Sequence, residues 1–279
     1  MSAPLLRRIA GRRQLLVGAV LTAAIVGIAI LSQFWTPEVP TRMRFALKLK
    51  GPLVQGLLGT DHFGRDLTSM LMVGAWNSLS IGVLAVAVGA SLGTLLGVSA
   101  AARGGLLEGA IMRLCDILFA FPAVLSAIVL GALMGPGAFT AVIAIGVFMI
   151  PVFARVTRGA AAQVWARDYV LAARAAGKGQ ARITLEHVLP NIASQIIVQA
   201  TIQLGLAILT EAGLSFLGLG IAPPAPSWGR MLADAQTYLS AAPHLALVPG
   251  IAIALSVLGF NLLGDGLRDL IDPRRRLGG

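Results

Sequence analysis

The stretch NSLSIGVLAVAVGASLGTLLGVSAA, residues 77–101, contains no charged residue. Its apolar residues do not alternate strictly with polar ones, whereas a strand of a membrane barrel is a segment of about ten alternating positions. A spanning helix needs about 20 predominantly apolar residues, and this stretch is long enough. The glycines and serines between Gly82 and Ser99 favour close helix packing inside a membrane. The stretch therefore predicts a transmembrane helix in a packed bundle.

The composition of the whole chain indicates the same class of protein. Of 279 residues, 57% are hydrophobic and 12% are charged, whereas soluble domains carry about a quarter charged residues. The single cysteine, Cys115, excludes an intramolecular disulfide and a cysteine-based metal cluster, and we interpret it as a small buried apolar residue. We expect an all-α integral membrane protein.

Six apolar stretches approach the length of a spanning helix. The third contains Pro122, and the fourth is short and ends near Pro151. Prolines are tolerated in membrane helices where neighbouring groups satisfy the freed carbonyls, so both stretches are kept as spans. The sequence thus predicts about six transmembrane helices. They are placed at Leu15–Trp35, Asn77–Ala101, Leu114–Met134, Ala138–Ala154, Ile192–Leu214 and Leu245–Leu263.

The distribution of Lys and Arg predicts the orientation of these helices. Cytoplasmic loops are enriched in both residues, and most of the 22 in this chain fall on one side if the N-terminus is inside. Both termini are therefore expected in the cytoplasm. The net charge of +10 follows from this topology, because the basic residues are spread over several loops and form no stripe that would bind a nucleic acid. The cytoplasmic basic residues are Arg7, Arg8, Arg12, Arg13, Arg103, Arg113, Arg155, Arg158, Arg167, Arg174, Lys178, Arg182, Arg268, Arg274, Arg275 and Arg276.

The N-terminal run RRIAGRR and the apolar stretch after it are interpreted as an uncleaved first span. The apolar run is longer than the core of a typical signal peptide, and no small-x-small cleavage pattern follows it. Trp35, at its end, fits an interfacial anchor.

A basic segment rich in small residues, DYVLAARAAGKGQARITLEHVLPN at residues 168–191, lies in the longest predicted cytoplasmic loop. Asp168 is a candidate N-cap for a short helix over Tyr169–Ala176, and Gly177 is its expected stop. A second short helix is predicted over Gln180–Val188, before the fifth span.

Each of these short helices has a distinct face. Small residues dominate one face of the first helix, which can therefore enter a groove closely. The apolar residues of the second helix are expected to lie back on the membrane helices. Together the two helices indicate a docking element. The face of the first helix consists of Tyr169, Ala172, Ala173 and Ala176, and that of the second of Ile183, His187 and Val188.

Several stretches resemble a known family. The residues Ala172-Ala173, Gly177 and Leu189-Pro190 resemble the EAA loop of permease subunits in ATP-binding-cassette importers, whose short coupling helix fits a groove on a cytoplasmic ATPase. Three further stretches resemble hallmark stretches of the DppC/OppC-type permeases of peptide and nickel importers, and the likeness runs from about Leu58 to Pro273. They are LGTDHFGRDLTSMLMVGAWNSLSIG at residues 58–82, DILFAFP at 116–122 and EAGLSFLGLGIAPPAPSWGRML at 211–232.

The resemblance implies a type I importer permease fold and a set of coupling residues. It implies a first part at residues 1–57, with the first span, and a permease core at 58–279 with a coupling loop at 155–191. Leu171 stands where the family pattern has glutamate, so docking at that position is expected to rest on shape. The implied coupling residues are Asp168, Tyr169, Leu171, Ala172, Ala173, Arg174, Ala176, Gly177 and Pro190.

The chain shows no site for chemistry of its own. A P-loop requires the spacing G-x-x-x-x-G-K-[ST], and Gly177-Lys178 is followed by Gly179. The three histidines fall in different predicted segments and form no zinc motif. ATP and Mg²⁺ are therefore expected on separate partner subunits, and we expect neither an enzyme nor a bound cofactor.

The extracytoplasmic segments contain the remaining polar candidates. A cluster that includes Asp61, Arg65 and Asp66 is expected to start a helix, with Asp61 near its first turn, and the resemblance places it at the outer mouth of a translocation path. A capped surface helix is an equally good interpretation. Trp228 is either a gate residue or an interfacial anchor, and the anchor role is favoured for Tyr238. Glu211 lies at membrane depth, where a structural hydrogen bond is favoured over a substrate contact.

The sequence thus predicts a permease subunit that imports di- or oligopeptides by alternating access in a bacterial inner membrane. The expected partners are a DppB/OppB-like second permease, two ATP-binding subunits, an extracytoplasmic substrate-binding protein and the lipid bilayer, with no nucleic acid. A nickel or other small-solute importer is the alternative within the class. An ATP-independent channel or secondary transporter is the alternative outside it, although the chain shows no convincing internal repeat.

Overall fold

The computed structural model describes residues 13–271, and within this range the chain is almost entirely helical, with no strand longer than one isolated bridge. The predicted basic residues Arg7, Arg8, Arg12, Arg274, Arg275 and Arg276 lie outside the described residues. In chain order the elements are α2 (Arg13–Leu31), η1 (Phe45–Leu47), α3 (Leu67–Arg103), α4 (Gly105–Ala120), α5 (Ala123–Met134), α6 (Ala138–Trp165), α7 (Asp168–Ala175), α8 (Gln180–Ile183), η2 (Thr184–Val188), α9 (Leu189–Phe216), α10 (Trp228–Ala235), η3 (Gln236–Tyr238) and α11 (His244–Ile271).

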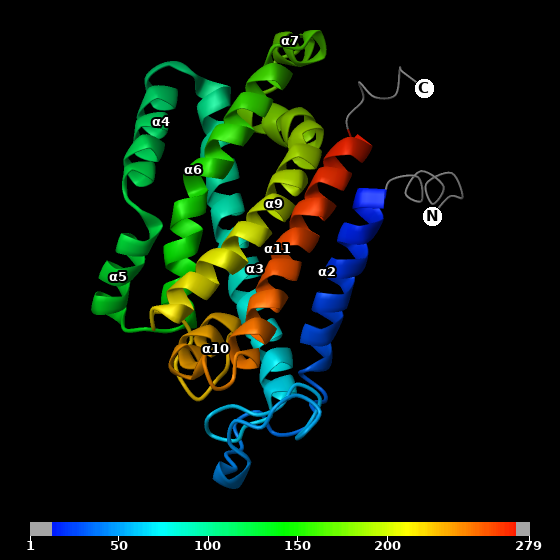
Figure 1. Cartoon of the computed structure of the whole chain (residues 1–279). Coiled ribbons are helices and arrows are strands. Elements are labelled where there is room, and N and C mark those ends of the chain that lie inside the picture. The colour runs from blue at the N-terminus through cyan, green and yellow to red at the C-terminus, as the bar shows by residue number, and fades with distance from the viewer. Residues whose placement is uncertain (1–12, 272–279) are drawn as a thin grey trace.

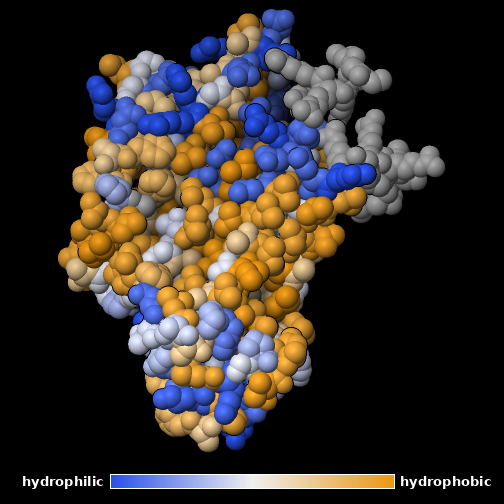
Figure 2. Space-filling view, viewed as in Figure 1, coloured by the Kyte–Doolittle hydropathy of each residue, from blue (hydrophilic) through white to orange (hydrophobic). Residues whose placement is uncertain are grey.

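The long helices confirm the predicted six-span architecture. In the described range, five helices are long and apolar enough to cross a membrane, and the bent pair of α4 and α5 makes a sixth crossing when it is counted as one span. The start of α2, the end of α11 and helix α7 all lie at the same end of the bundle (Figure 1). Hydrophobic residues cover the middle of the visible face, and hydrophilic residues gather at its two ends (Figure 2). We call the end that carries α7 the cytoplasmic end.

Two predicted span boundaries were wrong because hydropathy detects the membrane crossing and not the end of the helix. Helix α6 does not end near Pro151 but continues to Trp165. Its polar extension is held by ion pairs to α4, where Arg155 Nη2 lies 2.7 Å from Asp116 Oδ1. Helix α3 begins ten residues before the predicted start, at Leu67, because Asp66 caps it.

The third predicted span is not one straight helix. It is broken at Phe121 and Pro122, and α4 and α5 meet at 84°. The residue before a proline is disfavoured in the α region, and Phe121 is indeed extended, with φ −89° and ψ 122°. Pro122 then precedes the first turn of α5, where its missing N–H costs little.

The centre of the bundle is the contact between α3 and α6, which pack along each other. Gly89, Gly93 and Gly97 lie one turn apart on α3 and face Met149, Phe153 and Thr157 of α6. A Cβ atom built at Gly93 would lie 2.5 Å from the carbonyl oxygen of Ile150, so no larger residue fits. The small residues noted in the sequence therefore do let two helix backbones approach closely.

The predicted second short helix is not separate. Helices α8, η2 and α9 form one continuous helix from Gln180 to Phe216. Pro190 lacks an N–H and its ring would clash with a carbonyl one turn earlier. The wide π turn of η2, in which Leu189 N–H donates to Thr184 O, lies directly before Pro190 and accommodates it without ending the helix. The prediction that Ile183 and Val188 pack inward is confirmed, since both side chains are fully buried.

Candidate docking helix and cytoplasmic cavity

Helix α7 is short and projects from the cytoplasmic end of the bundle (Figure 1). Its N-cap is Arg167, so Asp168 is the first helical residue and makes no capping hydrogen bond, contrary to the prediction. An acidic residue in the first turn still complements the helix dipole. Gly177 ends the turn as predicted: its φ is +82°, and Lys178 N–H donates to Ala173 O at 3.1 Å. Helix α7 therefore has its N-cap one residue earlier than predicted.

The free face of α7 differs from the predicted arrangement at one residue, Ala173. Val170 is buried and Ala173 is half-buried against a cluster of residues from α3, α6 and α9. The outward face instead carries Leu171, Ala172 and Ala175, all of which are exposed. Ala173 therefore anchors the helix, and it does not belong to the free surface. The remaining predicted coupling residues on α7 and its C-terminal turn, Asp168, Tyr169, Arg174, Ala176 and Gly177, are exposed, as is Pro190.

The corner after α7 is fixed by a small charge network. The carboxylate of Glu186 accepts hydrogen bonds from Lys178 Nζ and Arg182 Nε, each at 2.6 Å. The ring of Tyr169 contacts that of His187 edge-on, with centroids 6.0 Å apart. Exposed ion pairs contribute at most about 1 kcal/mol each, so this network orients the corner more than it stabilises the fold.

A cavity of about 740 Å³ lies beside α7, between the cytoplasmic halves of α6, α9 and α11. Its wall combines polar residues with apolar ones such as Val156, Ile192 and Val198. A hydrophilic area extends over the cytoplasmic ends of α9 and α11 in Figure 2. The polar residues of the wall are Gln163, Arg167, Tyr169, Asn191, Ser194, Gln195, Gln199 and Arg268.

Sequence reasoning missed this cavity, although a signal was present. Asn191, Gln195, Gln199 and Gln203 recur every four residues, so they follow one side of α9, and the last three lie inside a predicted span. An amide stripe of this kind is unusual in an otherwise apolar helix. The first three line the cavity, whereas Gln203 is buried. Of the predicted coupling residues, only Tyr169 reaches the cavity wall.

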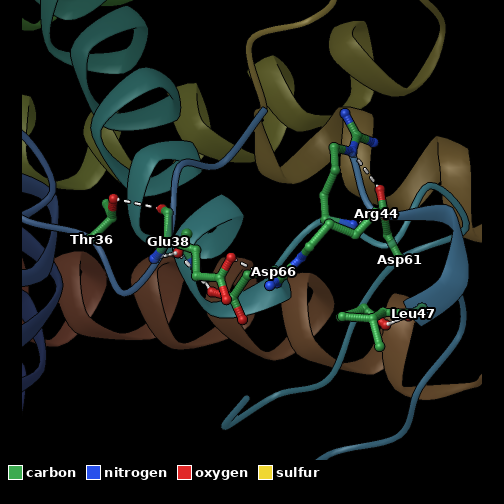
Figure 3. A network of polar contacts seen from close by, with 9 residues as sticks. Thr36, Glu38, Arg44, Leu47, Asp61 and Asp66 are labelled. Carbon is green, nitrogen blue, oxygen red and sulfur yellow. Dashed lines mark hydrogen bonds and ion pairs between the residues drawn. The ribbon is translucent and has the colours of Figure 1, made fainter. Parts of the chain in front are cut away.

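The extracytoplasmic polar residues come together around the start of α3 (Figure 3). Asp61 was predicted near the first turn of this helix, but Asp66 takes that place and caps α3 by accepting the Ser69 N–H at 2.7 Å. Asp61 lies in the preceding loop, where Arg65 Nε donates to its Oδ2 at 2.6 Å. Arg65 also faces Asp234 of α10 at 3.7 Å. Asp61, Arg65 and α10 therefore form one unit on the outer side.

The Asp61–Arg65 pair predicts a measurable loss of stability. Both side chains are nearly buried, at 6% and 8% exposure. Removing one partner of a buried pair leaves an uncompensated charge, so Arg65→Gln is expected to lower the unfolding free energy by about 3 kcal/mol. The measurement is thermal unfolding in detergent, with the exposed Arg42→Gln as control. The double variant with Asp61→Asn should recover part of the loss, and a single variant as stable as the control would contradict the prediction.

Trp228 is buried, with 2% exposure, and is not an interfacial anchor within this chain. Its indole N–H donates to Leu71 O at 3.0 Å, which ties α10 to α3. Tyr238, for which the anchor role was favoured, stacks on His62 with centroids 5.1 Å apart. Both rings thus pack the outer segments onto the bundle.

Glu211 is fully buried near the outer end of α9, as predicted from its depth. Ser215 Oγ donates to its Oε1 at 2.5 Å, whereas Oε2 has no hydrogen-bond partner among the described residues. This bond lies within α9, and the hydroxyl groups of Ser78 on α3 and Ser227 at the start of α10 also interact with the carboxyl group. Helix α10 covers this region, because Gly229 packs directly on the backbone of Ala212.

Comparison with known proteins agrees with this architecture. The family model described as binding-protein-dependent transport system inner membrane component matches residues 93–277. The chain is 40% identical over 261 residues to the dipeptide transport system permease protein DppC of Alkalihalophilus pseudofirmus, covering 94% of this chain and 86% of that protein. It is 42% identical over 251 residues to the glutathione transport system permease protein GsiD of Pectobacterium atrosepticum, covering 90% and 83%.

A solved structure shares the fold. A chain of the inward-facing MetNI methionine ABC transporter matches with a TM-score of 0.57 and 20% identity, covering 73% of this chain and 97% of that chain. Five or six candidate crossings in the described part of the chain and the apolar middle of the visible face define an integral membrane protein. The chain belongs to the family of binding-protein-dependent transport system inner membrane components, and it is a multi-pass protein of the inner membrane with the type I importer permease fold.

Proposed function

We propose that this chain is one of two permease subunits of an ATP-driven importer of short peptides. The relatives described above are named for the transport of dipeptides and of glutathione, which are both short peptides. The observation that carries the proposal is the placement of α7: its outward face is free, while Tyr169 at its first turn lines the polar cavity. A force on α7 thus reaches the wall of a candidate substrate path.

The free energy for transport is proposed to come from two partner ATPase subunits that bind ATP and Mg²⁺. The sequence contains no P-loop, so a contact surface is required, and Leu171, Ala172 and Ala175 offer a small apolar one. A second, DppB/OppB-like permease is proposed to complete the pathway, and an extracytoplasmic binding protein to deliver the peptide.

The anchoring of α7 supports a rigid-body mechanism of alternating access. Val170 and Ala173 belong to a buried cluster that includes residues of α3, α6 and α9, and the main contacts of α7 are with α6 and α8. A shift of α7 on ATP binding is therefore transmitted to α6 and to the continuous helix of α8, η2 and α9. Such motion of packed units between two states opens the path on one side and closes it on the other. ATP supplies the bias because it binds the two states with different affinity.

The outer residues are proposed to act as part of the extracytoplasmic gate. Arg65 joins the loop before α3 to α10, and Trp228 joins α10 to α3. These contacts hold α10 over the outer end of the bundle. Asp61 and Asp66 fix the same loop, while Glu211 below α10 is assigned a structural role. We also keep as a proposal the division of the chain into a first part with the first span, residues 1–57, and a permease core, residues 58–279.

The decisive experiment is reconstitution with the partner subunits. The chain should copurify with a second permease and an ATPase, and vesicles should take up labelled dipeptide only with ATP and the binding protein. Uptake of Ni²⁺ but not of peptide would favour the nickel alternative. Uptake without ATPase subunits would favour a channel or secondary transporter and would overturn the proposal.

A further inference from the structure

The wall of the cytoplasmic cavity has a definite chemical character. Gln163, Asn191, Ser194, Gln195 and Gln199 supply neutral donors and acceptors, and none of the described lining residues is Asp, Glu, His or Cys. A metal ion prefers carboxylate, imidazole or thiolate ligands. The wall therefore does not suit Ni²⁺, and it matches a ligand that itself carries amide groups.

The amides are available to a ligand. Asn191 Nδ2 donates to His187 O at 2.6 Å, which fixes this side chain at the mouth. Among the described residues, the side chains of Gln163, Gln195 and Gln199 make no hydrogen bond to protein. Because α9 rises 1.5 Å per residue, Asn191 to Gln199 spans about 12 Å, which is enough to follow a short extended peptide.

Two arginine side chains line the same cavity. Arg167 lies at the junction of α6 and α7, and Arg268 lies in the last turn of α11. Within the described range, neither guanidinium lies within 4 Å of a carboxylate. A guanidinium binds a carboxylate through paired, charge-assisted hydrogen bonds. The two arginines thus offer a site for one negative charge at the end of the amide stripe.

We propose that this cavity is a binding station on the cytoplasmic side of the transport path, in which the amide stripe binds the peptide groups of a short peptide and Arg167 and Arg268 bind its carboxylate. The inference rests on the proposed peptide import and assigns the residues that carry it. The volume of about 740 Å³ falls within the range of roughly 300–1,000 Å³ typical of small-ligand sites.

The first test measures ATP-driven dipeptide uptake by the complete transporter. Arg268→Gln, and separately Gln195→Leu with Gln199→Leu, should lower uptake roughly tenfold, the effect expected for losing a charged or a paired set of hydrogen bonds. Arg268→Lys keeps the charge and should retain most of the uptake. The exposed cytoplasmic arginine of α4 provides the matched control, Arg113→Gln, which should transport like the unmodified chain.

The second test measures occupancy of the cavity directly. The one native cysteine, Cys115, is buried, so in a Cys115→Ser background a Gln195→Cys variant carries a single accessible thiol. Dipeptide should slow its reaction with a maleimide severalfold during turnover, and Ni²⁺ should not. A thiol placed on α4 by Ala110→Cys should react with the maleimide at the same rate with and without dipeptide.

The outcomes separate the two proposals. If the unmodified transporter imports peptide while the cavity variants transport normally and dipeptide does not protect the Gln195→Cys thiol from labelling, the binding station is wrong and peptide import stands. If no peptide is imported, the proposed function fails. If the Arg268→Gln defect disappears in vesicles that lack anionic lipid, the arginines bind a lipid headgroup and the carboxylate assignment is overturned.

Discussion

Replacing Gly93 of α3 by leucine is expected to prevent the chain from folding into a stable bundle. A Cβ atom at this position would lie 2.5 Å from Ile150 O and 2.6 Å from the Cβ of Phe153, both on α6. Backbone atoms cannot yield as the end of a flexible side chain can, so α3 and α6 must separate. Overpacking of a well-packed core costs about 1–3 kcal/mol and occasionally more, and here the clash falls on the central helix pair.

The measurement is the yield of monodisperse protein in detergent together with its thermal unfolding temperature. Gly93→Ala should already lower that temperature, and Gly93→Leu should abolish the folded fraction. Gly27→Ala in α2 is the control, because a Cβ there would meet nothing within 4 Å. Alanine also favours a helix over glycine by about 1 kcal/mol, so the control should be at least as stable. Equal stability of the Gly93 and Gly27 variants would refute the close approach of α3 and α6.

Placing arginine at Ala172 is expected to disconnect ATP hydrolysis from transport. Ala172 is exposed on the outward face of α7, next to Leu171 and Ala175, and makes no packing contact that the fold needs. A long charged side chain at the centre of a closely fitting interface removes binding free energy of more than about 1.4 kcal/mol, which is a tenfold loss of affinity. Uptake should therefore fall at least roughly tenfold, while membrane insertion stays normal.

The readouts are copurification of the ATPase and peptide uptake at equal amounts of inserted protein. Ala110→Arg, an exposed position on α4, is the matched control. The same change at Ala173 is a poor test, because Ala173 packs inward and a charge there would disturb the fold itself. Leu171→Glu restores the acidic residue of the family pattern. It should also weaken coupling if the groove that receives α7 is apolar at this point. Normal uptake by both variants would rule out α7 as the docking helix.

The candidate site was only partly accessible from the sequence. The candidate docking loop was predicted from its charge, its alanines and Gly177, because local helix signals need no tertiary information. Of the predicted face of α7, Tyr169, Ala172 and Ala176 are exposed, and only Ala173 was misplaced, since Ala172 and Ala173 are chemically identical and only the tertiary packing distinguishes them. The cavity was missed because its wall combines residues from three helices that are distant in sequence.

The sequence by itself determined the class of this protein, because 57% hydrophobic and 12% charged residues indicate a membrane protein and its long apolar stretches without strict alternation indicate helices and not a barrel. Apolar length also predicted about six spans, and the placement of Lys and Arg predicted cytoplasmic termini. The tertiary structure alone decided where helices continue past the membrane, as α6 does beyond Pro151. It alone decided that Phe121–Pro122 breaks a span while Pro151 and Pro190 do not. The physical reason is that hydropathy is a property of each residue, whereas packing, capping and cavity walls depend on which residues the fold brings together.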